Sequence, residues 1–201
     1  MMISKVYPNL KIEKSFLDKE IICGIDEVGR GCLAGPVIAA AVILDYKNIP
    51  KGINDSKKLS KKMREIISNE IKKTSIEVAI GEASVYEIDK LNILNASILA
   101  MKRAYYNLPK KPNVALIDGN FSPDINCKVL NIIKGDTKSL SIAAASIIAK
   151  VHKDKIFQLL HKKFPKYNFK NNSGYGTKEH YTAISEFGIC QHHRKSFKLY
   201  K

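Results

Sequence analysis

Four acidic residues stand where carboxylates could do chemistry. Asp26 and Glu27 are adjacent and follow an apolar run, and Asp118 and Asp136 end two further runs that are rich in valine, leucine and isoleucine. Functional sites of α/β proteins collect at strand ends, because loops converge there over a rigid sheet. We therefore expect the four carboxylates to meet at one edge of a sheet.

Carboxylates gathered in one place repel one another unless a cation lies between them. Hard oxygen ligands favour Mg²⁺ or Mn²⁺ over Zn²⁺. Two such ions, roughly 3.5–4 Å apart, could hold an attacking water and a leaving oxygen in line at a phosphodiester. The pattern predicts a catalytic site for two divalent ions, Mn²⁺ or Mg²⁺, whose ligands are Asp26, Glu27, Asp118 and Asp136.

The net charge points to the kind of partner. The 201 residues include 34 Lys and Arg against 19 Asp and Glu, which gives a formal charge of +15. An excess of this size indicates a polyanion, since each phosphate that is neutralised releases counterions. A merely solvated basic surface is the alternative. The lysine pairs at 57–58, 61–62 and 72–73 fit phosphate contact and a solvated helix face equally well.

The elements that must position the acids follow from the hydrophobic pattern. Apolar or alternating runs predict strands at 21–25, 36–44, 76–83, 113–118 and 128–136. Helical spacing predicts helices after Ser60, from Ser84 or Tyr86 to Pro109, from Ser139 to Pro165, and at 178–187. This order predicts an α/β fold with a mixed five-stranded sheet flanked by helices. We expect one domain over 1–201, with a core at about 20–163 and a C-terminal helical extension at about 164–201.

Other kinds of site are less well supported. The four cysteines form no C-x-x-C pair, which argues against a zinc knuckle, and free thiols fit a reducing cytoplasm. The first residues contain no continuous apolar segment of a signal peptide, and the uncharged runs fall short of the roughly 20 residues that span a bilayer. The five histidines could suggest a histidine acid–base ribonuclease. They lie on predicted helices or in the basic tail, where we expect solvated or capping roles.

Six motifs carry a resemblance to a known family. They are GIDEVGRGCLAGPV, DSKKLS, LIDGN, KGDTKSLSIAAASIIAKV, SGYGTKEH and HHRKSF, and they occur in this order from about Ile21 to Phe197. Together they resemble bacterial ribonuclease HII, the type 2 ribonuclease H. The resemblance implies an RNase H-like fold and metal-dependent endonucleolytic cleavage of RNA in RNA–DNA hybrids. It also implies cleavage at single ribonucleotides embedded in duplex DNA, with 5′-phosphate and 3′-hydroxyl products.

The resemblance also assigns roles to individual residues. Asp26, Glu27, Asp118 and Asp136 match the four metal-binding catalytic acids of the family. The substrate-binding positions are Gly29, Arg30 and Gly31, which match the loop that reads the ribose 2′-hydroxyl, together with Lys57, Tyr175 and Arg194. Lys57 would contact a phosphate, and Tyr175 would pack on the sugar next to the ribonucleotide. Arg194 lies in another motif of the family.

Glycines on both sides of Arg30 would let the main chain approach a ribose edge closely. The 2′-hydroxyl is the group that distinguishes RNA from DNA at one position. Two residues depart from the family pattern: Cys32 replaces a common proline, and Ser173 replaces a common lysine. Without the proline the loop is expected to be less stiff, and without the lysine one basic contact is lost. Neither departure removes a predicted metal ligand.

Two alternatives share this fold. A type 3 ribonuclease H would need a further N-terminal nucleic-acid-binding domain, whereas about 20 residues precede the first predicted strand, and its glycine loop normally lacks the arginine. A non-catalytic nucleic-acid-binding module would be expected to have lost at least one acid, and all four are present. We expect a monomer that acts on RNA–DNA hybrids and on DNA containing ribonucleotides, with no membrane association.

Overall fold

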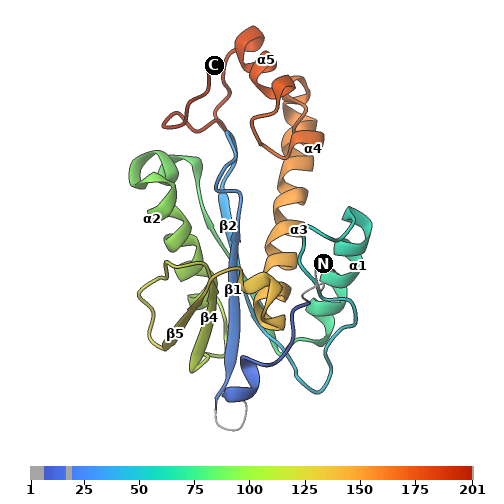
Figure 1. Cartoon of the computed structure of the whole chain (residues 1–201). Helices are drawn as coiled ribbons and strands as arrows, with labels where there is room; N and C mark the ends of the chain where they lie inside the picture. The colour runs from blue at the N-terminus through green and yellow to red at the C-terminus, as the bar shows by residue number, and fades with distance from the viewer. Residues whose placement is uncertain (1–6, 17–19, 201) are drawn as a thin grey trace, which may run out of the picture.

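The computed structural model describes residues 7–16 and 20–200. Its centre is a five-stranded sheet in the order β3-β2-β1-β4-β5 (Figure 1). The strands are β1 (Ile22–Val28), β2 (Val37–Ile43), β3 (Glu77–Ala83), β4 (Val114–Asp118) and β5 (Lys128–Ile132). β2 pairs antiparallel with both β1 and β3, whereas β4 pairs parallel with both β1 and β5. The predicted mixed α/β sheet is confirmed.

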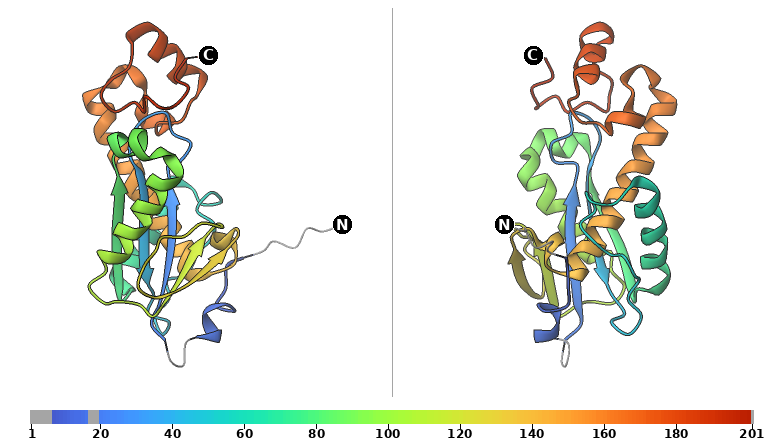
Figure 2. Two further views of the ribbon diagram at one scale, coloured as in Figure 1. Left: turned by 90° about the vertical axis from the view of Figure 1, so that its left-hand side faces the viewer. Right: turned by 45° about the vertical axis from the view of Figure 1, so that its right-hand side comes forward.

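Helices cover both faces of the sheet (Figures 1 and 2). These helices are α1 (Lys61–Thr74), α2 (Val85–Tyr106) and α3 (Leu140–Lys163), whereas α4 (Phe169–Asn172) and α5 (Lys178–Phe187) lie in the C-terminal region beyond the sheet. The apolar side chains of α2 pack with Cys23 and Ile25 of β1 in one core. Those of α1 and α3 pack in a second core on the other face, against β2 side chains such as Ile38 and Val42. Alternate residues of β1 therefore face different helices.

Helix α3 lies unusually close to β1, and glycine makes this possible. A Cβ on Gly24 would overlap the main chain of Ser141 and Ile142. The buried alanines 143–145 on α3 add little bulk at the same contact. This close approach fixes the position of the polar residues of α3 relative to the end of β1.

The predicted helix starts are confirmed. The hydroxyls of Ser60 and Ser139 accept hydrogen bonds from the main-chain N–H groups of Met63 and Ile142, and Ser84 forms a capping box with Glu87. One helix differs from the prediction. Asn92 has φ 67° and ψ 166°, which interrupts α2. Its side-chain oxygen accepts hydrogen bonds from the N–H groups of Leu94 and Asn95, so it caps the second half of the helix.

Two strand boundaries correct the prediction. β1 continues to Val28, so Asp26 and Glu27 lie within its last residues rather than beyond its end. β5 ends at Ile132 rather than 136, and Lys134 with φ 56° turns the chain. Asp136 consequently lies in a 3₁₀ turn, Gly135–Thr137, that leads into α3.

The C-terminal region packs on the end of α3 and on the loop after β1. Its core contains Leu33, Ala34, Phe157, Tyr167 and Phe169. The short helix α4 follows α3 in this region, and the helix predicted at 178–187 forms as α5. None of the helices within residues 7–16 and 20–200 is long and apolar enough to cross a membrane. The limits of a single domain over 1–201 stay a prediction.

Candidate active site

The four predicted acids line one cleft of about 260 Å³ at the end of β1. Seven further residues line the same cleft: Val28, Ser56, Lys57, Arg64, Ser146, Lys150 and Tyr175. Residues far apart in the sequence, from Asp26 to Tyr175, thus line the same cleft. The expectation that the four acidic side chains lie close together is confirmed.

Neighbouring strands and one turn position the acids. Asp26 and Glu27 follow each other in β1, and Asp26 accepts a hydrogen bond from the N–H of Glu27 at 2.8 Å. Asp118 is the last residue of β4, which runs parallel to β1. Its Oδ1 accepts a hydrogen bond from the N–H of Gly135 at 2.6 Å. This bond ties the turn that carries Asp136 to the sheet.

Burial and mutual repulsion act together on these carboxyl groups. Burial, and then the charges of Glu27 and Asp118, hold the pKa of Asp26 well above its usual range. Burial also raises the pKa of Glu27, although Arg30 at 3.4 Å opposes this effect. The pKa of Asp118 is raised by burial, against the hydrogen bond from Gly135. The positive charge around the cleft is therefore too small to neutralise these carboxylates when they are ionised.

Lys57 supplies part of that charge. Its Nζ lies 3.6 Å from Oδ2 of Asp136, while the lysine side chain itself is 84% exposed. Burial alone would lower the pKa of Lys57, but the charges of Asp136 and Asp55 outweigh it and raise this pKa. A lysine so placed faces both the acids and the solvent from which a phosphate would arrive.

The donor set fits hard divalent cations. All four side chains offer carboxylate oxygens, and a cation among them would relieve the repulsion that, together with burial, raises the pKa values of Asp26, Glu27 and Asp118. Within the described residues, no three acidic, histidine or cysteine side chains are arranged so that they could together hold one ion. The carboxylates line an open cleft, which suits ions that keep part of their water shell.

The glycine–arginine loop follows β1 directly and is held from beneath by Arg194. Gly29 has φ +94°, a conformation that favours glycine. Arg194 is fully buried, and its guanidinium donates to the carbonyls of Gly29 at 2.7 Å and Arg30 at 2.8 Å. It also donates to the carbonyls of Gly35 at 2.9 Å and Pro36 at 3.2 Å. The assignment of Arg194 as a substrate-binding residue is therefore corrected: its side chain lies under the loop and positions it.

Tyr175 stands across from this loop. It forms an antiparallel bridge with Cys32, and its side chain is 41% exposed at the cleft. The buried ammonium of Lys153 lies 4.2 Å from the centre of its ring, and burial raises the pKa of the phenol to about 12. Lys153 thus supports the face of the ring from inside the protein.

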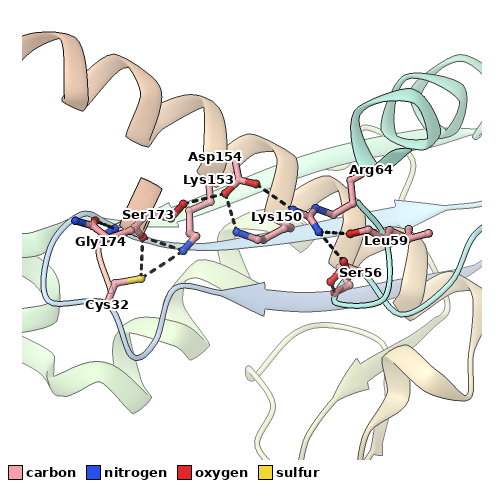
Figure 3. A network of polar contacts seen from close by, with 11 residues as sticks. Cys32, Ser56, Leu59, Arg64, Lys150, Lys153, Asp154, Ser173 and Gly174 are labelled. Carbon is pink, nitrogen blue, oxygen red and sulfur yellow. Dashed lines mark hydrogen bonds and ion pairs between the residues drawn. The ribbon is translucent and has the colours of Figure 1, made fainter. Parts of the chain in front are cut away.

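The two departures from the family pattern contact each other (Figure 3). The thiol of Cys32 donates to the carbonyl of Ser173 at 3.4 Å, and Lys153 donates to the same carbonyl at 3.1 Å. Ser173 also donates to Asp154 at 3.4 Å. The loop that carries Tyr175 is therefore held by Cys32 and by Lys153 and Asp154 of α3.

The cleft wall carries cations that the sequence pattern did not predict (Figure 3). Asp154 accepts from Lys150 at 2.7 Å and lies 3.7 Å from Arg64. Arg64 in turn donates to the carbonyls of Ser56 at 2.9 Å and Leu59 at 2.6 Å, which holds the loop that bears Lys57. A signal was present: Ser146, Lys150 and Asp154 recur every fourth residue along α3, and so share one face of the helix.

Comparisons with known proteins show the family of this chain. The family model described as Ribonuclease HII matches residues 23–200. The chain belongs to the ribonuclease HII family. Its relatives include ribonuclease HII of Pelagibacter ubique, 56% identical over 89% of this chain and 96% of the relative. Ribonuclease HII of Macrococcus caseolyticus is 51% identical over 96% of this chain and 72% of the relative.

Solved structures support the same family. RNase HII in a PCNA:RNase HII complex from Archaeoglobus fulgidus is 30% identical, covers 90% of this chain and 96% of its own, and superposes with a TM-score of 0.73. Ribonuclease H2 from Pyrococcus horikoshii, 24% identical over 89% and 94% of the two chains, has a TM-score of 0.74 and supports the fold. The family match decides between types 2 and 3, and the chain is a type 2 ribonuclease H, an endonuclease.

Proposed function

We propose that this ribonuclease HII cleaves RNA in RNA–DNA hybrids and also cuts duplex DNA at a single embedded ribonucleotide. The products would carry 5′-phosphate and 3′-hydroxyl ends. One observation carries the proposal: a cleft lined by four carboxylates adjoins a glycine loop and the exposed ring of Tyr175. The loop begins two residues after Glu27, so recognition and chemistry share one end of β1.

Asp26, Glu27, Asp118 and Asp136 would hold two divalent ions, Mg²⁺ or Mn²⁺. Bound there, the ions would supply the positive charge that activates a water and stabilises the leaving oxygen. The shortage of positive charge around the buried carboxylates supports this assignment. A ribonuclease HIII of the same fold, 22% identical with a TM-score of 0.65, has been solved in complex with Mn²⁺.

The geometry of the loop supports recognition by the main chain. A Cβ built on Gly31 would have only the Tyr175 ring near it, at 3.9 Å, so the space over this residue is open. A ribose could approach the loop main chain there, with its 2′-hydroxyl as the group read. Tyr175 would pack on the adjacent deoxyribose. Lys57 and the further cations of the cleft wall, Arg64 and Lys150, would contact phosphates.

We expect the chain to act as a monomer. The four cysteines are free thiols, which supports a reducing compartment, the cytoplasm. Both assignments belong to the proposal.

The test uses the purified chain and a DNA duplex with one ribonucleotide, with Mg²⁺ or Mn²⁺ and with excess EDTA. We expect one cut per duplex with either metal and none with EDTA. The end groups are read by ligation and by phosphatase sensitivity. Cleavage that persists in EDTA, or products with 3′-phosphates, would overturn the two-ion assignment.

A further inference from the structure

Two histidines lie buried behind the loops that face the substrate. His180, near the start of α5, is 0% exposed and His193 is 1% exposed, which corrects the expectation that the histidines are solvated or capping. Their Nε2 atoms lie 3.1 Å apart. Neither side chain lines the catalytic cleft, so the proposed chemistry does not use them directly.

The partners of the two rings fix the direction of every hydrogen bond. Nδ1 of His180 lies 2.9 Å from the carbonyl of Tyr175, which can only accept, so this nitrogen carries a proton. Nδ1 of His193 accepts from the N–H of Cys190 at 2.9 Å, so it carries none. Two neutral rings then complete one chain: His193 donates from Nε2 to Nε2 of His180, and His180 donates from Nδ1 to Tyr175.

This chain of bonds connects two segments that flank the loop after β1. Tyr175 bridges to Cys32 on one side, and His193 bridges to Ala34 on the other. The N–H of Leu33 donates to the carbonyl of Gly174 at 2.7 Å, and the N–H of Gly35 to that of His192 at 2.8 Å. Residues 32–35 therefore form the middle of three short segments, and the histidine pair joins the outer two behind them.

We propose that His180 and His193 are positioning residues that fix Tyr175 relative to the glycine–arginine loop, and so tune the enzyme for single ribonucleotides in DNA. This inference rests on the proposed role of Tyr175. The bond from His180 holds the Tyr175 carbonyl, and the bridge to Cys32 holds the same residue from the other side. A shift of the ring by 1 Å in a binding site can reduce the rate about a hundredfold.

The surroundings keep both rings neutral. Tyr167 and Phe169 pack edge-on or tilted against the pair, with the Tyr167 ring 4.8 Å from that of His193. The remaining titratable groups nearby are the thiol of Cys190, 3.3 Å from Nδ1 of His193, and the imidazole of His192. Burial lowers the pKa of both rings, that of His193 to about 4. A second proton on His180, at Nε2, would face the N–H of His193. A second proton on His193, at Nδ1, would face the main-chain N–H of Cys190.

The first test needs no substrate. Long-range ¹H–¹⁵N spectra of the wild-type protein at pH 7 distinguish the two neutral tautomers of each histidine. We expect the proton on Nδ1 of His180, the less common tautomer, and on Nε2 of His193. The opposite tautomer on His180, or a charged ring on either residue, would overturn the proposed chain of hydrogen bonds from His193 through His180 to Tyr175.

The second test measures substrate preference. His180→Phe removes the donor to Tyr175, whereas His180→Asn places an amide N–H near the position of Nδ1. We expect His180→Phe to lose at least tenfold more kcat/KM on a duplex with one ribonucleotide than on a duplex with four, and His180→Asn to restore most of this difference. His152→Gln is the control, because this partly exposed histidine has its bond to Glu82 away from the cleft.

The outcomes separate this inference from the proposed function. If the wild type does not cut the single-ribonucleotide duplex, the proposed function fails. If the wild type cuts it and His180→Phe loses activity equally on both substrates, or not at all, the positioning role is wrong. A His180→Phe variant that does not fold leaves the tautomer measurement and the His180→Asn variant to decide.

Discussion

The guanidinium of Arg194 donates from Nη1 to the carbonyl of Arg30 at 2.8 Å, deep beneath the glycine–arginine loop. The same guanidinium holds the carbonyl of Gly29 at 2.7 Å. Burial lowers the pKa of Arg194 to about 10, so the side chain remains charged at pH 7. A buried cation from the C-terminal extension thus determines the path of a loop in the core of the fold.

Arg194→Lys should test this relationship. A lysine offers three donors from one point and cannot reach four carbonyls that surround a planar guanidinium. We expect the free energy of unfolding to fall by about 2–4 kcal/mol and kcat/KM to fall at least tenfold under conditions where the variant is folded. Lys195→Gln is the control, since Lys195 bonds to Asp89 through its main-chain N–H. Wild-type activity in Arg194→Lys would refute the positioning role.

The two glycines of the loop should respond differently to alanine. Gly29 has φ +94°, so Gly29→Ala should lower the free energy of unfolding by about 1–2 kcal/mol. Gly31 has open space over it, so Gly31→Ala should change that free energy by less than about 0.5 kcal/mol.

The effects on activity should have the opposite order, because Gly31→Ala should impair cleavage although it barely changes stability. We expect Gly31→Ala to reduce cleavage of the single-ribonucleotide duplex at least tenfold, because a methyl group occupies the approach of the ribose. Denaturant unfolding and steady-state kinetics on the same preparations measure both effects. Unchanged kinetics in Gly31→Ala would show that no ribose approaches this residue.

Asp26→Asn should separate stability from catalysis. Burial and the neighbouring carboxylates raise the pKa of Asp26, so its ionised form destabilises the metal-free protein at pH 7. We expect the variant to gain about 1 kcal/mol in the free energy of unfolding without metal, yet to lose cleavage. Binding to the duplex at low salt should persist, because the basic surface supplies affinity. Near wild-type turnover would remove Asp26 from the site.

Buried His193 should make stability depend on pH. Its pKa falls from an ordinary value of 6.5 to about 4 on folding, so the unfolded chain binds more protons between these values. The contribution is complete above about pH 6.5 and is lost as the pH falls toward 4. Between pH 7 and pH 5, the contribution of His193 to the free energy of unfolding falls by about 2 kcal/mol. The raised carboxyl pKa values act in the opposite direction, because folding favours protonation of those groups.

The measurement must therefore compare variants. Urea unfolding at pH 7 and pH 5 should show a drop in stability for the wild type, relative to His193→Gln, of about 2 kcal/mol. Gln keeps an amide near Nε2 but does not titrate. The same pH dependence in both proteins would show that His193 is not the neutral, buried group described here.

The sequence predicted the sheet and the convergence of the four acids on one cleft, because strand periodicity and strand ends are local signals. Asp136 was the exception: Lys134 adopts a left-handed conformation that its residue type does not favour, so the strand was predicted too long. Asn92 interrupts α2 by capping its second half, which helical spacing cannot reveal.

The supporting residues were harder to predict, because their roles depend on distant segments. Lys153 lies under Tyr175, and Arg194 under Gly29 and Arg30, only once the C-terminal extension has packed on α3. His180 and His193 come from separate segments, and their pairing has no sequence pattern. Such contacts follow from tertiary packing and not from local spacing.

The most direct test of the account is a set of matched duplexes that contain zero, one or four ribonucleotides in otherwise identical DNA. With Mg²⁺ or Mn²⁺, we predict no cleavage of the all-DNA duplex, and a single cut on the 5′ side of the lone ribonucleotide. A site whose polar groups need the 2′-hydroxyl should discriminate by about 10⁴-fold against its absence. Equal cleavage of the all-DNA duplex, or failure to cut at the single ribonucleotide, would contradict the account.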